Sequence, residues 1–323
     1  MYRKVSAIVI PTIIAIGIIA YMLFRVWDDL LEALRHVVPG YLAIGVGICL
    51  AAWWLRGWRY QTILRSLSYQ ISLVVSTACI FVSQTANLVV PARLGDFVRV
   101  FILKHEYDTT YSKGISSVVV ERVFDVVTVA ILGAIALIFI LNVPPVYYTI
   151  ILLPLVAGVI FFIVLFCLGR CSAENKYIQI LFTMLHEIKR ASLSLRSILV
   201  LGFSSIIIWL FDIFVCVSVI MMFEQLIPFA VVVLAVVIGN LVKAVPITPG
   251  GIGTYEISLA IIFGLAGVSP AIATLIAVID HLIKNLVTLA GGVVSIYFFG
   301  DWVIPSIKSA LNTKLGGGKE SDR

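Results

Sequence analysis

Two short motifs place ionisable side chains inside long apolar segments of the chain. Charged groups are costly inside a bilayer, so such residues usually mark a substrate path, an ion path or a proton relay. The same groups could instead serve only to lock helices together, and the sequence leaves that alternative open. The two motifs, ERVFD and DHLIK, supply six residues to this polar network: Glu121, Arg122, Asp125, Asp280, His281 and Lys284.

The spacing within each motif predicts which charges can meet. Each motif begins about ten residues into its apolar segment, which at 1.5 Å per residue is about half the thickness of a bilayer core. The first and last charges are four residues apart and share a helix face, so Asp280 and Lys284 are predicted to pair. Glu121 and Asp125 repel each other and need a cation. The candidates are Arg93, Arg99 and Arg122.

Two turns rich in proline and glycine indicate a second kind of chemistry, anion binding. The stretch NLVVPARLGDFVRV, at 87–100, carries two arginines, and a guanidinium is suited to phosphate. The stretch TPGGIGTYE, at 248–256, exposes backbone N–H groups, and a helix that starts near 253–256 would point its N-terminus at an anion. The predicted substrate-binding residues are Asn87, Arg93, Arg99, Gly250, Gly251, Gly253 and Glu256.

Purely structural interpretations of these turns remain open. Both turns could be purely structural breaks in helices. Asn87 could satisfy freed backbone groups, and Glu256 suits the start of a helix even without a function. Asp212 is a lone acid in an apolar segment that could pair with Lys243 or lie in a wet cavity.

Composition predicts the elements that must position these residues. Hydrophobic residues make up 61% of the 323-residue chain and charged residues 12%, with a mean hydropathy of +1.12. Uncharged runs at 5–24, 37–55, 126–169, 257–279 and 285–300 are as long as membrane-crossing helices or longer. Because a spanning segment must satisfy its own backbone groups, we predict an all-α polytopic membrane protein.

The distribution of basic residues predicts the topology. One arrangement places 16 of the 23 lysines and arginines on one side, against Arg25 and Arg35 on the other. By the positive-inside rule both termini are cytoplasmic, and 301–323 is a cytoplasmic tail. The net charge of +6 then needs no nucleic acid to explain it. We expect a multi-pass protein of the cell membrane, with about six spans near 5–24, 37–55, 110–141, 147–169, 198–223 and 271–299.

Two further segments, 66–104 and 225–267, must leave and return on the same side. They are predicted helical hairpins, either re-entrant or fully crossing. The apolar spacing in 174–196 predicts an amphipathic helix on the inner surface, and 26–37 a shorter one on the outer surface.

The two halves of the chain resemble each other. PARLGDF at 91–97 aligns with PGGIGTY at 249–255 at an offset of 158, and ERVFD aligns with DHLIK at an offset of 159. The first hairpin enters from inside and the second from outside, so the copies are inverted. We predict one domain, 1–300, built from inverted repeats at about 1–142 and 147–300, as in many transporters. Chance similarity between turns is the alternative.

Enzyme chemistry has little support in the sequence. The four histidines are scattered and form no HExxH motif, and the chain contains no GxSxG motif and no Walker loop. The five cysteines form no CxxC motif. We therefore predict neither a metal site nor a cofactor, and no enzymatic activity.

NLVVPARLGDFVRV, ERVFDV and PITPGGIGTYE, in this order, resemble the lysylphosphatidylglycerol synthase transmembrane family, also called flippase-like or UPF0104. The resemblance covers roughly residues 5–300. It implies movement of a lipid between leaflets, as in the bacterial members that are joined to a soluble aminoacyl transferase. Only about twenty residues follow the last predicted span here, so the resemblance does not extend to lysyl transfer. Some relatives are fused to glycosyltransferases, which leaves the lipid open.

Together these observations predict a flippase-like translocase of an anionic phospholipid, whose head group binds between the two hairpins. The polar network would rearrange as access alternates between the two sides. The alternative is a membrane partner that presents lipid to a separate lipid-modifying transferase and moves nothing itself. An integral membrane transferase is a third, less favoured hypothesis.

Overall fold

A computed structural model describes residues 16–24, 27, 37–90, 93–141, 143–169, 175–245 and 248–299. Within these ranges every regular element is a helix, which confirms the all-α prediction. The predicted tail at 301–323 lies outside the described residues, as do the first part of the span at 5–24 and most of the outer surface helix at 26–37.

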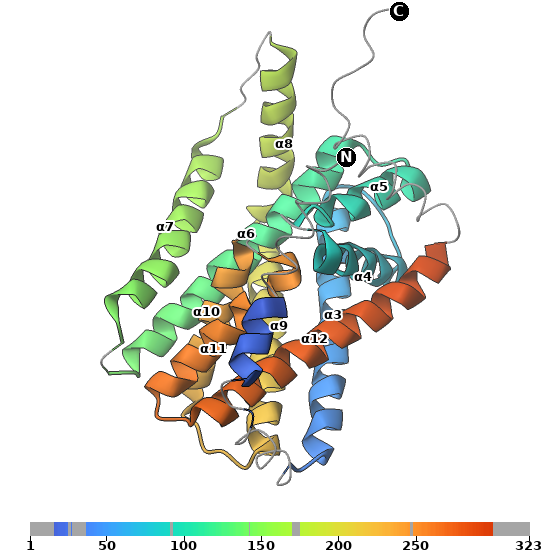
Figure 1. Ribbon diagram of the computed structural model, residues 1–323. Helices are drawn as coiled ribbons and strands as arrows, with labels where there is room; N and C mark the ends of the chain where they lie inside the picture. Colours follow the sequence, from blue (N-terminus) through green and yellow to red (C-terminus); the bar gives the residue numbers. More distant parts are fainter. Residues whose placement is uncertain are drawn as a thin grey trace, which may run out of the picture.

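Five long helices form the frame of the protein (Figure 1): α3 (Gly40–Ser66), α6 (Tyr111–Ile138), α7 (Pro145–Cys167), α9 (Leu195–Met222) and α12 (Pro270–Phe299). Four of them, α3, α7, α9 and α12, are long and apolar enough to cross a membrane. α6 has 28 residues but carries three charged residues, Glu121, Arg122 and Asp125, near its middle. Their positions agree with the predicted spans except for α3, which continues 11 residues beyond the expected end at residue 55.

The two predicted hairpins form, each with one longer and one shorter arm. The first consists of α4 (Leu73–Val89) and α5 (Asp96–Tyr107), and the second of α10 (Phe229–Ala244), the short turn η2 (Pro249–Gly251) and α11 (Thr254–Leu265). α5 and α11 have 12 residues each. Twelve residues rise about 18 Å, well short of the roughly 30 Å of a bilayer core, which supports re-entrant hairpins.

Side-chain caps fix where several helices begin. The hydroxyls of Ser72, Thr110 and Ser194 accept hydrogen bonds from backbone N–H groups in the first turns of α4, α6 and α9. Asn175 caps α8 (Lys176–Ser192) in the same way. These polar residues satisfy donors that a helix start leaves free, and they break the apolar runs at the predicted loops.

The predicted surface helix of 174–196 is α8, which packs its C-terminal half on α6. Ile188 and Ala191 are buried, and Glu187 accepts hydrogen bonds from Ser112 and Ser116 of α6. The N-terminal half leaves Tyr177 exposed.

The two halves of the chain pack against each other reciprocally. α3 lies along α9, while α4 packs on α12 and α10 packs on α6. In Figure 1, α12 runs obliquely across the bundle past α3 towards α4. A glycine allows each crossing: a Cβ on Gly133 of α6 would meet Val237 of α10, and one on Gly292 of α12 would meet Thr85 of α4. These glycines are 159 residues apart, the offset of the two charged motifs, which supports the repeat.

Gly292→Val is expected to destabilise the protein by about 1–3 kcal/mol, because overpacking forces neighbours apart. A Cβ there would lie 1.9 Å from Thr85 Oγ1, whose hydroxyl donates to the carbonyl of Thr288. Gly202→Val on α9 is the matched control, since a Cβ at that position has no neighbour within 4 Å. Thermal unfolding of both variants in detergent checks the crossing, and equal melting temperatures would contradict it.

Candidate functional site

A cavity of about 170 Å³ lies between the two halves of the chain. Its wall is built by α3, α4, α6, α9, α10 and α12 and by residues of both hairpin turns, which we call the first tip (93–95) and the second tip (248–253). Among the described residues that line it, cations outnumber carboxylates, so the wall carries net positive charge. The cations are Arg56, Arg93, Arg122, Lys243 and Lys284, and the carboxylates are Glu121, Asp125 and Asp212.

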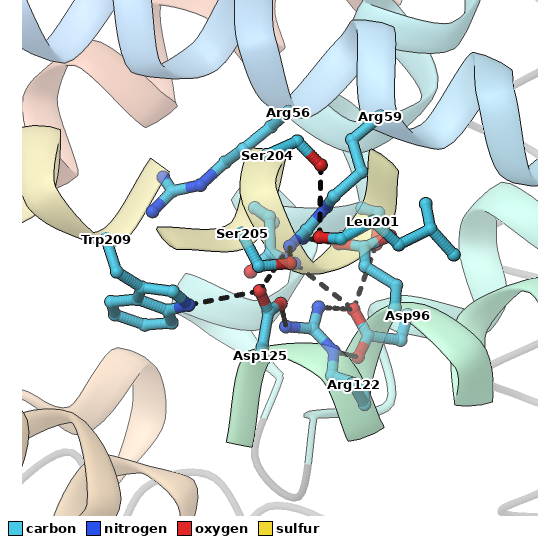
Figure 2. Close-up of polar contacts among 12 residues, drawn as sticks. Arg56, Arg59, Asp96, Arg122, Asp125, Leu201, Ser204, Ser205 and Trp209 are labelled. Carbon is cyan, nitrogen blue, oxygen red and sulfur yellow. Dashed lines mark hydrogen bonds and ion pairs between the residues drawn. The ribbon is translucent and has the colours of Figure 1, made fainter. Parts of the chain in front are cut away.

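Asp125 of α6 lies at the centre of the polar contacts from the first half (Figure 2). Its carboxylate accepts a 2.7 Å hydrogen bond from Arg59 of α3 and a 3.2 Å bond from the indole of Trp209 on α9. Arg122 lies 3.8 Å away on the same helix. Arg59 also donates to Ser205 and is 1% exposed. A buried charge needs such partners, and Asp125 has them without any ligand.

Glu121 is held by two arginines, one of which, Arg59, it shares with Asp125. Arg99 of α5 donates to its carboxylate, and Arg59 lies 3.6 Å from it. The Arg99 guanidinium is fully buried and stacks over the ring of Tyr60 at 4.7 Å. Arg99 therefore lies behind the cavity wall. The sequence predicts that it binds phosphate, but in the structure its guanidinium does not line the cavity. Its charge already neutralises Glu121.

Asp96, the first residue of α5, connects the first tip to the helices around it. Arg122 donates two hydrogen bonds to its carboxylate, both 2.9 Å long. Ser83, Gln84 and Asn87 of α4 also donate to it. The predicted ligand Asn87 does line the cavity, and its amide nitrogen donates to Asp96.

The second half repeats this arrangement with the charges exchanged. Lys284 of α12 donates to Asp212 of α9 at 3.1 Å and to Asp280 at 2.9 Å, so the predicted pair of Asp280 and Lys284 forms. Tyr255 of α11 also donates to Asp280. In the first half the acid is on α6 and the base on α3, whereas here the base is on α12 and the acid on α9. Arg56 joins the halves by reaching Asp212 at 3.5 Å.

His281 of α12 joins a cation and a carboxylate in one buried chain. Its Nδ1 lies 2.7 Å from Glu256 Oε1, and its Nε2 lies 3.0 Å from the ammonium of Lys243. The other oxygen of Glu256 accepts from the backbone N–H of Gly253. The N–H of Gly253 therefore donates to Glu256, and Glu256 faces His281. The sequence predicts that both residues bind the substrate, but in the structure their polar groups are bonded to each other and to His281.

Arg93 and Lys243 differ from the other cations of the cavity wall. Within the described part of the chain, neither makes an ion pair with a carboxylate within 4 Å, and Lys243 is bonded only to the ring of His281. The two cations lie close enough to repel each other. Gly251 packs on the aliphatic part of the Lys243 side chain, because a Cβ there would come within 2.5 Å of its Cγ. Arg93 of the first tip and Lys243 of α10, beside the second tip, thus bring positive charge to one cavity.

The backbone of Arg93 is strained. Its φ is +53°, a left-handed conformation that costs a residue with a side chain about 1 kcal/mol or more. Gly251, the residue 158 positions later in the aligned tip, has a φ of +77° and bears no such cost. An arginine where the other repeat has glycine indicates that its side chain serves a purpose at this point of the cavity.

Several residues of the site are missing from the prediction. The predicted span ends at residue 55, so the charge distribution assigns Arg59 to a cytoplasmic loop. The motifs give Asp96 and Tyr255 no role, although Asp96 is an ionisable residue next to a hairpin turn, a signal that points to it. Asp212 pairs with Lys284 and Arg56 and not with Lys243, and it lies in the cavity wall, the other position that the sequence left open.

Comparison with known proteins places the chain in a family of membrane proteins. The family model of the lysylphosphatidylglycerol synthase TM region matches residues 11–292. The glycosyltransferase AglD of Haloferax volcanii is 30% identical over 312 residues, which cover 82% of this chain and 50% of that protein. The chain thus spans about half the length of that relative.

Two relatives match over most of their own length. A UPF0104 membrane protein of Methanothermobacter thermautotrophicus is 25% identical over 351 residues, covering 98% of this chain and all of that protein. A UPF0104 membrane protein of Pyrococcus horikoshii is 26% identical over 270 residues, covering 73% of this chain and 80% of that protein. With its helices, its charged cavity and these matches, the chain belongs to the family of the lysylphosphatidylglycerol synthase transmembrane region.

Proposed function

We propose that this protein moves an anionic phospholipid between the leaflets of the cell membrane, with the phosphate bound by Arg93 and Lys243. The observation that supports this most directly is the pair of cations, one near each tip, that face the cavity without a carboxylate partner. Unpaired charges in a largely buried cavity are costly. An incoming phosphate would give both cations a hydrogen-bonded anionic partner and would offset the repulsion between Arg93 and Lys243.

The charge of the cavity wall also bears on the lipid class. The described lining residues carry five cations against three carboxylates, so a head group with net negative charge is favoured. An aminoacylated head group, which adds a positive charge, would be repelled by the same wall. The proposal therefore concerns an anionic lipid and does not extend to the lysylated lipid that gives the family its name.

The interlocked halves provide a way to alternate access. α3 and α9 pack along each other, and three polar contacts link the two networks: Arg56–Asp212 at 3.5 Å, Arg59–Ser205 at 2.7 Å and Trp209–Asp125 at 3.2 Å. Rocking one half against the other would break these contacts while each half keeps its own ion pairs. In this scheme both termini are cytoplasmic and the protein catalyses no covalent chemistry.

Translocation by the purified full chain in proteoliposomes tests the proposal. Fluorescent phosphatidylglycerol should exchange between leaflets faster than in protein-free vesicles, whereas fluorescent lysyl-phosphatidylglycerol, whose head group is cationic, should not. Exchange of both lipids at one rate would show that the cavity charge does not select the substrate. Exchange of neither would remove the proposed activity.

A second function is favoured by one comparison. Because the relative AglD is named a glycosyltransferase and has about twice the length that the chain matches, this membrane region could serve a separate transferase by presenting lipid to it. This alternative requires lipid binding without translocation when the protein is reconstituted alone, together with co-purification of a lipid-modifying enzyme. The same proteoliposome assay separates the two.

A further inference from the structure

We propose that His281 takes up a proton when an anion binds beside Lys243, so that a lipid phosphate and a proton occupy the cavity together. This inference rests on the proposed function and adds the ion that would couple to it. It is carried by the arrangement of three side chains, Lys243, His281 and Glu256, in one hydrogen-bonded chain that ends at the cavity.

The hydrogen-bond partners define the protonation state of His281. An ammonium group has donors but no acceptor, so Lys243 must donate and Nε2 of His281 must accept. Nδ1 then carries the ring proton and donates to Glu256 Oε1, 2.7 Å away. The imidazole is therefore neutral while the cavity holds no anion. Glu256 is fixed in turn by the backbone N–H of Gly253.

The other titratable groups of the cavity are already committed. Glu121 and Asp125 are paired with arginines, and Asp212 with Lys284 and Arg56, so each of these carboxylates is stabilised as an anion. Among the described lining residues, His281 is the remaining neutral base that could accept a proton.

An anion changes the balance around His281 in two ways. It competes with Nε2 for the Lys243 ammonium, and it adds negative charge next to a ring that Glu256 already stabilises from the other side. Lys243 then turns to the anion and its bond to Nε2 breaks. A proton from water adds to Nε2, while the Nδ1–H bond to Glu256 stays intact. The step involves no oxidation or reduction. An anion and a proton bound together change the net charge of the cavity less than the anion alone does.

Charged and titratable groups face His281 from every helix that packs around it. Lys243 lies on α10, Glu256 and Tyr255 on α11, and Asp280 and Lys284 on the same helix, with the Tyr255 ring centroid 4.5 Å from the imidazole. Lys284 is neutralised by Asp212 of α9 and by Asp280, which leaves Lys243 as the cation that opposes protonation. Movement of Lys243 towards the anion thus removes the nearest opposing charge and favours binding of the proton.

Linkage makes this testable, because a proton taken up on binding makes affinity rise as the pH falls. Dihexanoyl-phosphatidylglycerol is a suitable probe, since a phosphodiester keeps one negative charge across the range used. We expect the full chain in detergent to bind it about tenfold or more tightly at pH 5.5 than at pH 7.5. In His281→Gln, which preserves hydrogen bonding but cannot take the proton, the ratio should fall to about 1.

His105→Gln is the matched control, because His105 is exposed on α5 and should keep the wild-type ratio. Calorimetry of the wild-type protein in two buffers of different ionisation enthalpy counts the protons directly and needs no variant. Binding without proton uptake, or an unchanged ratio in His281→Gln, would overturn the coupling but leave the anion site standing. Absence of binding at both pH values would instead remove the proposed function itself.

Discussion

Arg93→Gly is expected to lower the translocation of anionic lipid roughly 10- to 150-fold, the effect of losing a charge-assisted hydrogen bond of about 1.5–3 kcal/mol. The guanidinium faces the cavity and makes no ion pair within the described residues, so its removal leaves no carboxylate unpaired. Glycine also relieves the left-handed backbone at φ +53°. The free energy of unfolding should therefore stay the same or rise by up to about 1 kcal/mol.

Arg93→Gly should thus lower transport without lowering stability. The chain offers a matched control for it. Glu224 has the same φ of +53° but lies exposed in the loop after α9. Glu224→Gly should relieve the backbone equally and leave translocation unchanged. Rates are measured in proteoliposomes and stability by thermal unfolding of the same preparations. If Arg93→Gly transports like the wild type, Arg93 does not bind the phosphate and the strain at the first tip needs another explanation.

Local rules predict the parts of the site that are encoded within one helix. Asp280 and Lys284 lie one turn apart, so their pairing follows from helix geometry alone. The positions of the long helices follow from the uncharged runs, because an apolar run needs about 20 residues to cross a bilayer. The aligned tips predict two equivalent breaks, and the structure adds equivalent glycines, Gly133 and Gly292, where helices of opposite halves cross.

Contacts between helices far apart in the sequence could not be read from the same rules. Arg59 lies where an apolar run has already ended, and counting basic residues assigns every such arginine to a loop. The structure buries it because α3 continues to Ser66, which brings Arg59 against Asp125 of α6 and Ser205 of α9. Similarly, nothing in the sequence indicates that Glu256 meets His281, 25 residues away on another helix.

The partner of Glu121 is the clearest example of a contact that the sequence does not predict. The sequence leaves three arginines as candidates for that partner, and it also assigns one of them, Arg99, to the phosphate. The structure gives Arg99 to Glu121, in full burial and over the ring of Tyr60. An arginine cannot neutralise a buried carboxylate and remain free for a ligand. The two roles predict opposite results for one substitution.

Arg99→Met is expected to destabilise the protein by about 3–5 kcal/mol, because it leaves Glu121 buried with only the more distant Arg59 at 3.6 Å. Methionine keeps much of the side-chain volume, so the loss reports mainly on charge. Adding Glu121→Gln removes the stranded carboxylate and should recover most of that loss. A double-mutant cycle of unfolding free energies in detergent measures the coupling between the two residues.

The double variant Arg99→Met/Glu121→Gln also decides between the two roles of Arg99. If Arg99 only neutralises Glu121, the folded double variant should bind dihexanoyl-phosphatidylglycerol within about threefold of the wild type. If it loses binding as Arg93→Gly does, then Arg99 reaches the anion in another state of the transport cycle, and Glu121 is its resting partner. Such a result would mean that the Arg99–Glu121 ion pair breaks during transport, since α5 would have to move the Arg99 guanidinium through the cavity wall. The folded fraction must be measured in the same samples, because a loss of stability alone would mimic a loss of binding.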